Sequence, residues 1–194
     1  MLRALVTRLV FLVCHFVCSL LVCAIYDGIF LQDEVELTLS WKGKTATRLA
    51  ESSWLSFDPS LPLSAKTDAA AKGWTLDVLG NPLDPLSVAF NGSRHFHAVH
   101  RGVCYEGPAN ADRPVSFPRF VIETVDTPFV APGDTAHLIN FDNSLPNLDG
   151  GMHFNLHNNA GWDCSAPWWY GDDAFFRFRV RMEPDAAVRG KCWE

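Results

Sequence analysis

The sequence predicts an all-β protein: an antiparallel β-sandwich preceded by one N-terminal hydrophobic helix. Three observations favour this fold class. Short stretches alternate apolar with polar residues, turn-forming residues recur roughly every 8–12 positions, and beyond the N-terminal segment no stretch shows the three-to-four spacing of a helix. The 194 residues suit one domain with a short targeting segment, and a hydrophobic content of 48% excludes a disordered chain.

The N-terminal segment has the features of a secretory leader. Residues 9–26 are almost wholly apolar and follow Arg3 and Arg8, which predicts a signal peptide over residues 1–24. The alternatives are an uncleaved signal anchor, which would span a membrane through residues 9–26, and a mis-started gene model. The first two interpretations make the β-sandwich domain, residues 25–194, secreted or lumenal, or anchored in a membrane with the domain on that same side.

Alternating segments predict the strands of the first half of the domain. We expect strands over Glu34 to Trp41 and Trp74 to Leu79, and a strand or loop over Ser53 to Phe57. The dipeptide Asn91-Gly92 joins two further alternating stretches, residues 86–90 and 93–100. Both of its residues tolerate the positive φ that a type I′ turn requires, so this region predicts a β-hairpin.

The second half of the domain continues the same pattern. The expected strands are Phe120 to Val125, Phe129-Val130, His137 to Phe141, Met152 to Asn158 and Ala174 to Met182. The first two of these are expected to pair with each other. The last one alternates apolar with basic residues, which predicts a strand with one face toward solvent.

Charge and short motifs exclude several functions. Lysine and arginine total 16 against 22 aspartate and glutamate residues, a net charge of −6 without a basic stripe, so nucleic acid is not an expected partner. No GxSxG, GxGxxG or CxxC motif occurs. Asp142, Asp172 and Asp173 offer carboxylates for a glycosidase, but adjacent residues of a strand point to opposite faces, so Asp172 and Asp173 cannot form a catalytic dyad there.

Histidines at strand spacing form the first candidate site. His95 and His97 are two residues apart, so their side chains share one face of the strand expected there, and the same spacing aligns His153, Asn155 and His157. If these two strands are neighbours, the imidazoles could converge on Zn²⁺, which nitrogen ligands bind well. The alternative, and our expectation, is a hydrogen-bonded polar face without metal or cofactor.

An aromatic loop forms the second candidate site. Trp168 and Trp169 lie near asparagine and aspartate residues, and aromatic faces beside amide and carboxylate groups suit sugar rings and their hydroxyls. The candidate carbohydrate-binding residues are therefore these two tryptophans together with His95, His97, His153 and Asn155. The alternative is that the large rings close one end of the sandwich.

Two further residue types carry expectations about processing. Cys104 with Cys164 is the expected disulfide, because Cys192 lies in a tail that we expect to be frayed. Asn91-Gly92-Ser93 is an N-glycosylation sequon, which makes Asn91 a candidate glycosylation site. The hairpin turn expected at the same place explains these residues equally well.

Three segments carry a resemblance to a known family. They are RLAESSWLSFDP (Arg48–Pro59), the stretch Gly73–Val99 with GWTLDVLGNPLDPLSV and NGSRHFHAV, and GMHFNLHNNAGWDCSAPWWYGDDAFFRFRV (Gly151–Val180). Over about Glu34 to Met182 the chain resembles a domain-of-unknown-function family. That family forms the C-terminal β-sandwich domain of proteins similar to class II alpha-mannosidases, glycoside hydrolase family 38.

The resemblance implies a large β-sandwich that packs behind a catalytic barrel. The aspartate nucleophile and the zinc site of such hydrolases belong to an N-terminal α/β domain that these 194 residues do not include. The expected function is a noncatalytic accessory domain that binds carbohydrate or docks to a catalytic glycosidase-like domain. The alternative is a small metal- or carboxylate-dependent glycoside hydrolase.

Overall fold

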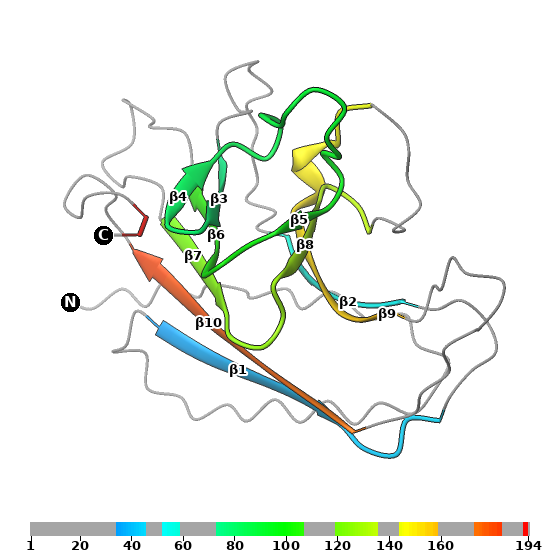
Figure 1. The fold of residues 1–194 in the computed structure, drawn as a ribbon. Coiled ribbons are helices and arrows are strands. Elements are labelled where there is room, and N and C mark those ends of the chain that lie inside the picture. The colour runs from blue at the N-terminus through cyan, green and yellow to red at the C-terminus, as the bar shows by residue number, and fades with distance from the viewer. Residues whose placement is uncertain are drawn as a thin grey trace, which may run out of the picture.

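The computed structural model describes residues 34–45, 52–58, 73–106, 119–135, 144–158, 173–183 and 192–193, which form two antiparallel sheets (Figure 1). This confirms the predicted all-β class. The predicted N-terminal helix lies outside the described residues, as does the expected strand at His137 to Phe141. Within the described ranges, no helix has the length and apolar character needed to cross a membrane.

The larger sheet has six strands. In spatial order these are β1 (Glu34–Trp41), β10 (Ala174–Glu183), β7 (Arg119–Thr124), β6 (Gly102–Glu106), β3 (Trp74–Val78) and β4 (Asn81–Leu83). β10 alternates as predicted: Phe178 is fully buried, whereas Arg179 on the opposite face is exposed. The sequence does not predict β6, because four of its five residues are buried and apolar and polar residues therefore do not alternate along it.

The smaller sheet has four strands. Their spatial order is β2 (Ser52–Phe57), β9 (Met152–Asn158), β8 (Phe129–Pro132) and β5 (His97–Ala98). β9 has the bounds that its alternation predicts. β2 and β9 pair with a register shift, because Ser53 lies opposite His157 whereas Trp54 lies opposite Asn155. One residue of β9, Leu156, is therefore extra, which is the mark of a β-bulge.

Aromatic rings from both sheets meet in the core. Phe154 of β9 and Phe178 of β10 are fully buried, and their ring centroids lie 5.2 Å apart. Phe57 of β2 lies 5.7 Å from the Phe154 ring and 5.8 Å from the Phe178 ring. The apolar faces of the two sheets thus bury one another, the arrangement expected of a β-sandwich.

The predicted hairpin around Asn91-Gly92 is wrong. Asn91 does adopt a positive φ of 62°, but the turn is closed by the Gly92 N–H, which donates to the Ala89 carbonyl at 2.8 Å. Residues 84–96 contain no strand, and β5 pairs with β8 instead. The reason is topological: this segment carries the chain from β4 in one sheet to β5 in the other, so its two ends cannot pair.

The expected pairing of Phe120 to Val125 with Phe129-Val130 is also wrong, although both strands exist. β7 pairs with β6 and β10 in the larger sheet, and β8 pairs with β9 and β5 in the smaller one. The short turn between them crosses the edge of the sandwich. Strand periodicity indicates which residues are extended, but it does not indicate which sheet a strand joins.

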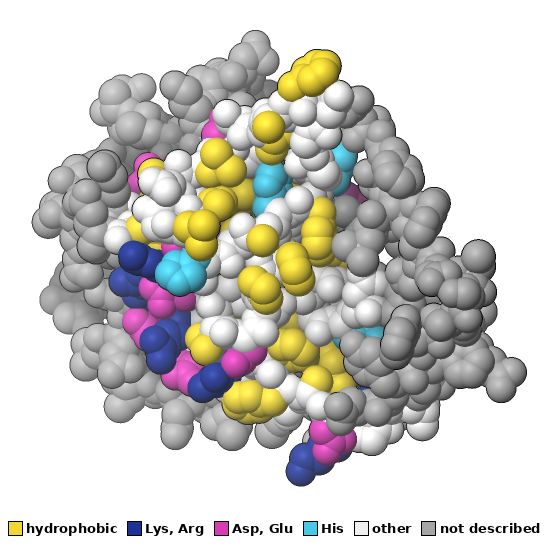
Figure 2. All heavy atoms as spheres, viewed as in Figure 1, with side chains coloured by type: hydrophobic (Ala, Val, Ile, Leu, Met, Phe, Trp, Pro, Cys, Tyr) yellow, Lys and Arg dark blue, Asp and Glu magenta, His cyan; other side chains and the backbone are white. Residues whose placement is uncertain are grey.

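The solvent-facing side of the larger sheet carries alternating charges. Figure 2 shows Lys or Arg and Asp or Glu side chains interspersed at one border of the described surface, whereas hydrophobic side chains are scattered over its middle. Two ion pairs contribute: Arg177 contacts Asp126 at 2.9 Å, and Arg181 contacts Glu123 at 2.8 Å. This mixed surface agrees with the absence of a basic stripe in the sequence.

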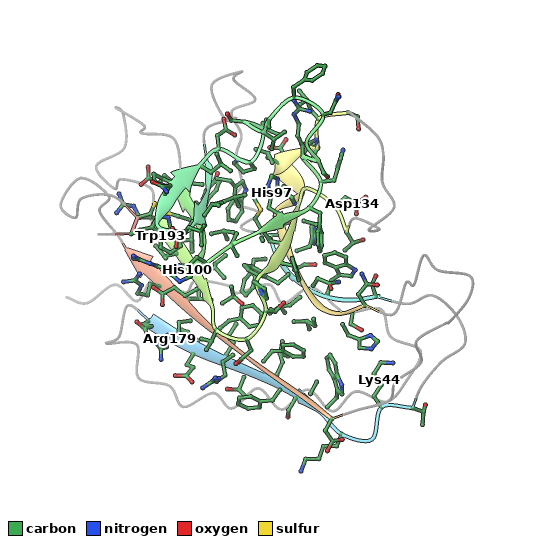
Figure 3. All side chains as sticks on the ribbon, in the orientation of Figure 1. Lys44, His97, His100, Asp134, Arg179 and Trp193 are labelled. Atoms are coloured by element: carbon green, nitrogen blue, oxygen red, sulfur yellow. A yellow bond between two sulfur atoms is a disulfide. The ribbon has the colours of Figure 1, made fainter. Side chains whose placement is uncertain are left out.

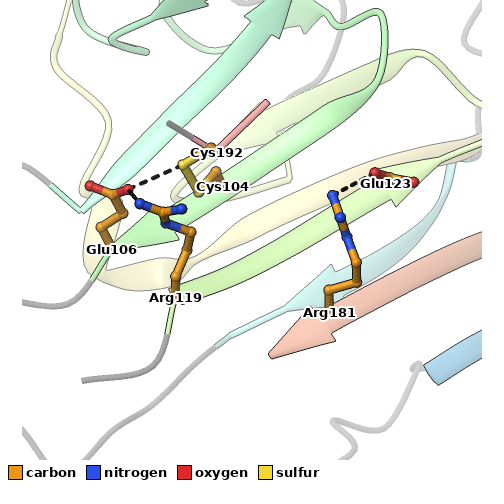
Figure 4. Close-up of a disulfide and its surroundings, with 6 residues drawn as sticks. All are labelled: Cys104, Glu106, Arg119, Glu123, Arg181 and Cys192. Atoms are coloured by element: carbon orange, nitrogen blue, oxygen red, sulfur yellow. Dashed lines mark hydrogen bonds and ion pairs between the residues drawn. A yellow bond between two sulfur atoms is a disulfide. The ribbon is translucent and has the colours of Figure 1, made fainter. Parts of the chain in front are cut away.

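The expected disulfide between Cys104 and Cys164 is wrong, because the sulfur of Cys104 is bonded to Cys192 (Figure 4). The Cα atoms of this pair lie 6.2 Å apart. The expectation assumed a frayed tail, but Arg101 donates from Nη1 to the Trp193 carbonyl at 2.9 Å and helps to hold the tail against the larger sheet. Cys164 lies outside the described residues.

Candidate functional site

A cavity of about 370 Å³ opens between the two sheets, where β1 and β9 end and β10 begins. Its lining includes aromatic residues from both sheets and polar residues from the strand ends. Those used below are Trp41, Phe176, His157, Asn155, Asp126 and Asp173. The volume falls within the roughly 300–1,000 Å³ range of small-ligand sites.

Trp41, at the end of β1, forms the aromatic wall of this cavity. Its ring centroid lies 5.2 Å from that of Phe176 on β10 and 6.5 Å from that of His157 on β9. The His157 ring stands nearly perpendicular to the indole, at 81°. Because the three rings come from three strands of two sheets, the wall depends on the packing of the sheets against each other.

The bulge in β9 explains why His157 faces this wall. His153 pairs with Ser56 and His157 pairs with Ser53, and these two serines lie on opposite faces of β2. His153 and His157 therefore also face opposite sides of the sheet. The prediction that His153, Asn155 and His157 share one face is wrong for His157, since the inserted residue reverses the alternation.

Asp126 contributes a carboxylate that is already fully engaged. Its Oδ2 accepts hydrogen bonds from the backbone N–H of Arg177 at 2.8 Å and from Nε at 3.0 Å, and its Oδ1 accepts from Nη2 at 2.9 Å. These bonds from the Arg177 side chain lower the pKa of Asp126 from its usual value of 3.8. Asp126 is consequently an ionised acceptor at neutral pH and is poorly suited to be a general acid, which requires a raised pKa.

Backbone and side-chain hydrogen bonds fix the other polar groups of the cavity. The Gly43 N–H donates to Asp173 Oδ1 at 2.7 Å, which ties the end of β1 to the start of β10. The Thr127 hydroxyl donates to the Asn155 carbonyl, and the Thr124 hydroxyl donates to the Thr127 carbonyl at 2.5 Å. The turn between β7 and β8 is thereby fastened to β9, so the polar wall is held in place before a ligand arrives.

The structure does not bring the predicted histidines together. β8 lies between β5 and β9, which separates these strands by about 10 Å. His97 pairs with Val130, which pairs with Phe154, so His97 is on the core-facing side of the sheet and the neighbouring residue His153 is on the other. In Figure 3, His97 lies well away from Lys44, which lines the cavity.

Each predicted histidine has a local partner instead of a shared ligand. His97 Nε2 lies 3.1 Å from the Arg94 carbonyl, and burial lowers its pKa. His95 precedes the strand and contacts the Ser144 hydroxyl at 3.5 Å. Among the described members of the predicted carbohydrate-binding set, Asn155 is the one that lines the cavity. Trp168 and Trp169 lie outside the described residues.

His153 occupies a polar niche on the solvent side of the smaller sheet. Its Nδ1 lies 2.7 Å from the Ser56 hydroxyl on the neighbouring strand. Burial lowers the pKa of His153, and the carbonyls of Gly133 and Gly150 and the carboxylates of Asp134 and Asp58 oppose this shift. At neutral pH the ring is therefore uncharged and serves as a hydrogen-bonding partner within the sheet.

Sequence reasoning missed most of the cavity. Trp41 and Phe176 are predicted only as apolar positions of alternating strands, and the sequence does not single out Asp126. These residues come together because the two sheets meet at one end of the sandwich. The sequence of a single strand does not indicate where the sheets meet. Asn91, the candidate glycosylation site, lies at an exposed turn, and its modification stays a prediction.

Comparison with known proteins gives no relative: no family model, no curated protein and no solved structure matches this chain. The resemblance to the C-terminal domain of proteins similar to class II alpha-mannosidases therefore rests on the quoted sequence segments alone and stays a prediction. The cavity geometry is the remaining guide to function.

Proposed function

We propose that this chain is a noncatalytic accessory β-sandwich module, of the kind associated with glycoside hydrolases, and that it binds carbohydrate in the cavity between the sheets. The observation that carries this proposal is the pairing of the Trp41–Phe176 wall with fixed polar groups, Asn155 and Asp173, around one opening. An aromatic face covers the apolar side of a sugar ring, and carbonyl and carboxylate oxygens accept hydrogen bonds from its hydroxyls.

The state of the cavity carboxylates favours binding over hydrolysis. A glycosidase needs one protonated and one ionised carboxyl group across the scissile bond. Asp126 accepts three hydrogen bonds from Arg177 and its pKa is lowered, and Asp173 accepts one from Gly43. Asp126 therefore accepts hydrogen bonds without supplying the proton that bond cleavage requires.

The test is a glycan-array screen of the full chain followed by calorimetric titration of the best oligosaccharide. Trp41→Ala should weaken binding at least about tenfold, equivalent to about 1.4 kcal/mol. Trp54→Ala is the matched control, because Trp54 lies on β2 and contacts Phe96 rather than the cavity. Thermal melting of both variants confirms that each is folded under the titration conditions.

The results separate the competing functions. Absence of glycan binding by the folded wild-type chain, or equal loss in the Trp41 and Trp54 variants, would contradict carbohydrate recognition at this cavity. Turnover of an aryl mannoside, with or without added Zn²⁺, would favour the small-hydrolase alternative instead. Docking to a catalytic glycosidase-like domain would become the better explanation if the isolated chain binds no sugar but co-purifies with such a domain.

A further inference from the structure

We propose that the larger sheet carries a zinc site that forms when the Cys104–Cys192 disulfide is reduced. Its ligands are the two cysteine thiolates and the carboxylate of Glu106. Cys104 and Glu106 are two residues apart on β6, so their side chains point to the same face of the sheet. Cys192 reaches this face from the C-terminal tail (Figure 4).

The donor atoms are already close together. One ligand atom from each of Cys104, Glu106 and Cys192 lies within 4.8 Å of the other two, and Cys192 Sγ is 3.3 Å from Glu106 Oε1. Zinc–sulfur bonds of about 2.3 Å and zinc–oxygen bonds of about 2.1 Å place two tetrahedral sulfurs about 3.8 Å apart and a sulfur and an oxygen about 3.6 Å apart. Reduction frees the sulfurs to reach that spacing.

The donor set is typical of zinc. Two soft thiolates select Zn²⁺ over Mg²⁺ and Ca²⁺, which prefer oxygen ligands alone. Three protein ligands leave the fourth tetrahedral position to water. The histidines of the described residues do not join this group, so the site differs in both place and chemistry from the histidine site that the sequence suggests.

Arg119 provides the electrostatic setting. Its Nη2 lies 2.8 Å from Glu106 Oε1, and its side chain is only 5% exposed. Arg119 therefore holds the Glu106 carboxylate in place, and that carboxylate lies 3.3 Å from Cys192 Sγ. The carboxylate has two oxygens, so Glu106 can keep its contact with Arg119 while it binds zinc.

The chemistry balances with a dithiol as reductant. The dithiol donates two electrons and two protons, is oxidised to its own disulfide, and leaves Cys104 and Cys192 as two thiols. Zn²⁺ then binds both sulfurs and displaces two protons. Because the same sulfurs form either the disulfide or the zinc bonds, the two states exclude each other, and either one fastens the tail to β6.

The test compares zinc content in the two redox states. The full chain is treated with a dithiol or left oxidised, the reagent is removed without oxygen, and Zn²⁺ is added before gel filtration and elemental analysis. The reduced chain should retain one more zinc ion per chain than the oxidised chain. Cys192→Ser should lose that ion, whereas Cys164→Ser should keep it, which distinguishes this site from zinc held by other cysteines.

A second pair of variants makes the test independent of the disulfide. Glu106→Gln preserves both cysteines and should weaken zinc binding at least about tenfold. Glu123→Gln is its matched control, because Glu123 forms a similar ion pair with Arg181 on the same face (Figure 4). Equal zinc content in both redox states, or the same affinity in the Glu106 and Glu123 variants, would overturn the proposal.

Discussion

Replacing Phe154 with alanine tests whether the two sheets share one core. Phe154 is fully buried on β9, and its ring contacts Phe57 of the same sheet and Phe178 of the opposite one. Truncating a buried phenylalanine costs about 3–5 kcal/mol, since both transfer energy and contacts around the new cavity are lost. The free energy of unfolding of a domain is about 5–15 kcal/mol, so this single change should remove a large fraction of it.

Urea denaturation followed by circular dichroism measures this loss. The midpoint should fall with little change in slope, because the same surface is exposed on unfolding. In a thermal melt, about 3–5 kcal/mol should lower Tm by roughly 6–20 °C for a domain of this size.

Trp54→Ala is the control for this prediction, and the structure revises its expected cost. From the sequence we expect Trp54, like Phe154, to be a core ring. In the structure, however, Trp54 is half-buried on the other face of the smaller sheet and donates to the Ser52 hydroxyl at 2.7 Å. Losing a half-buried ring should cost about 1–2 kcal/mol. A cost below about 1 kcal/mol for Phe154→Ala, or equal costs for both variants, would refute the shared core.

Two further predictions concern protonation and backbone conformation. Folding lowers the pKa of His153, so below a pH of about 6.5 the unfolded chain binds more protons than the folded chain. The free energy of unfolding should therefore decrease as the pH is lowered below that value, until the folded ring also protonates. His153→Gln should flatten urea midpoints measured across that window, and an unchanged pH profile would argue against the shift. Gly102 has a φ of +152°, and an added Cβ would lie 2.0 Å from the Ile122 carbonyl oxygen. Gly102→Ala should therefore cost more stability than Gly43→Ala. A Cβ at Gly43 would have no neighbour within 4 Å, so that variant carries only the cost of its φ of +62°, about 1–2 kcal/mol. Equal losses of stability in the same denaturation assay would contradict this prediction.

Alternation is a good guide to the long strands and a poor guide to their pairing. β1, β9 and β10 match their predicted bounds closely, because each has one face in the core and one face toward solvent. The hairpin at Asn91-Gly92 fails because a local turn preference cannot overrule the crossing between sheets. Pairing depends on which strands meet in space, and that information is distributed over the whole chain.

The candidate site is less predictable from sequence than the fold. Asn155, His157 and Asp173 are named by the sequence and also line the cavity, but the β-bulge separates His157 from the face of His153, and the intervening strand β8 isolates His97. A bulge adds one residue to a strand without any change in composition, so residue spacing alone cannot reveal it. The disulfide partner of Cys104 depends likewise on where the tail returns.

An NMR titration of the indole N–H groups tests the central claim most directly. The oligosaccharide selected by the glycan array is added to the labelled chain, and proton spectra of the sugar in the same sample report any released sugar. We predict that the Trp41 resonance shifts in a saturable manner while Trp54 stays in place and the oligosaccharide remains intact. A shift confined to Trp54, or the appearance of free sugar, would contradict a noncatalytic carbohydrate-binding cavity between the two sheets.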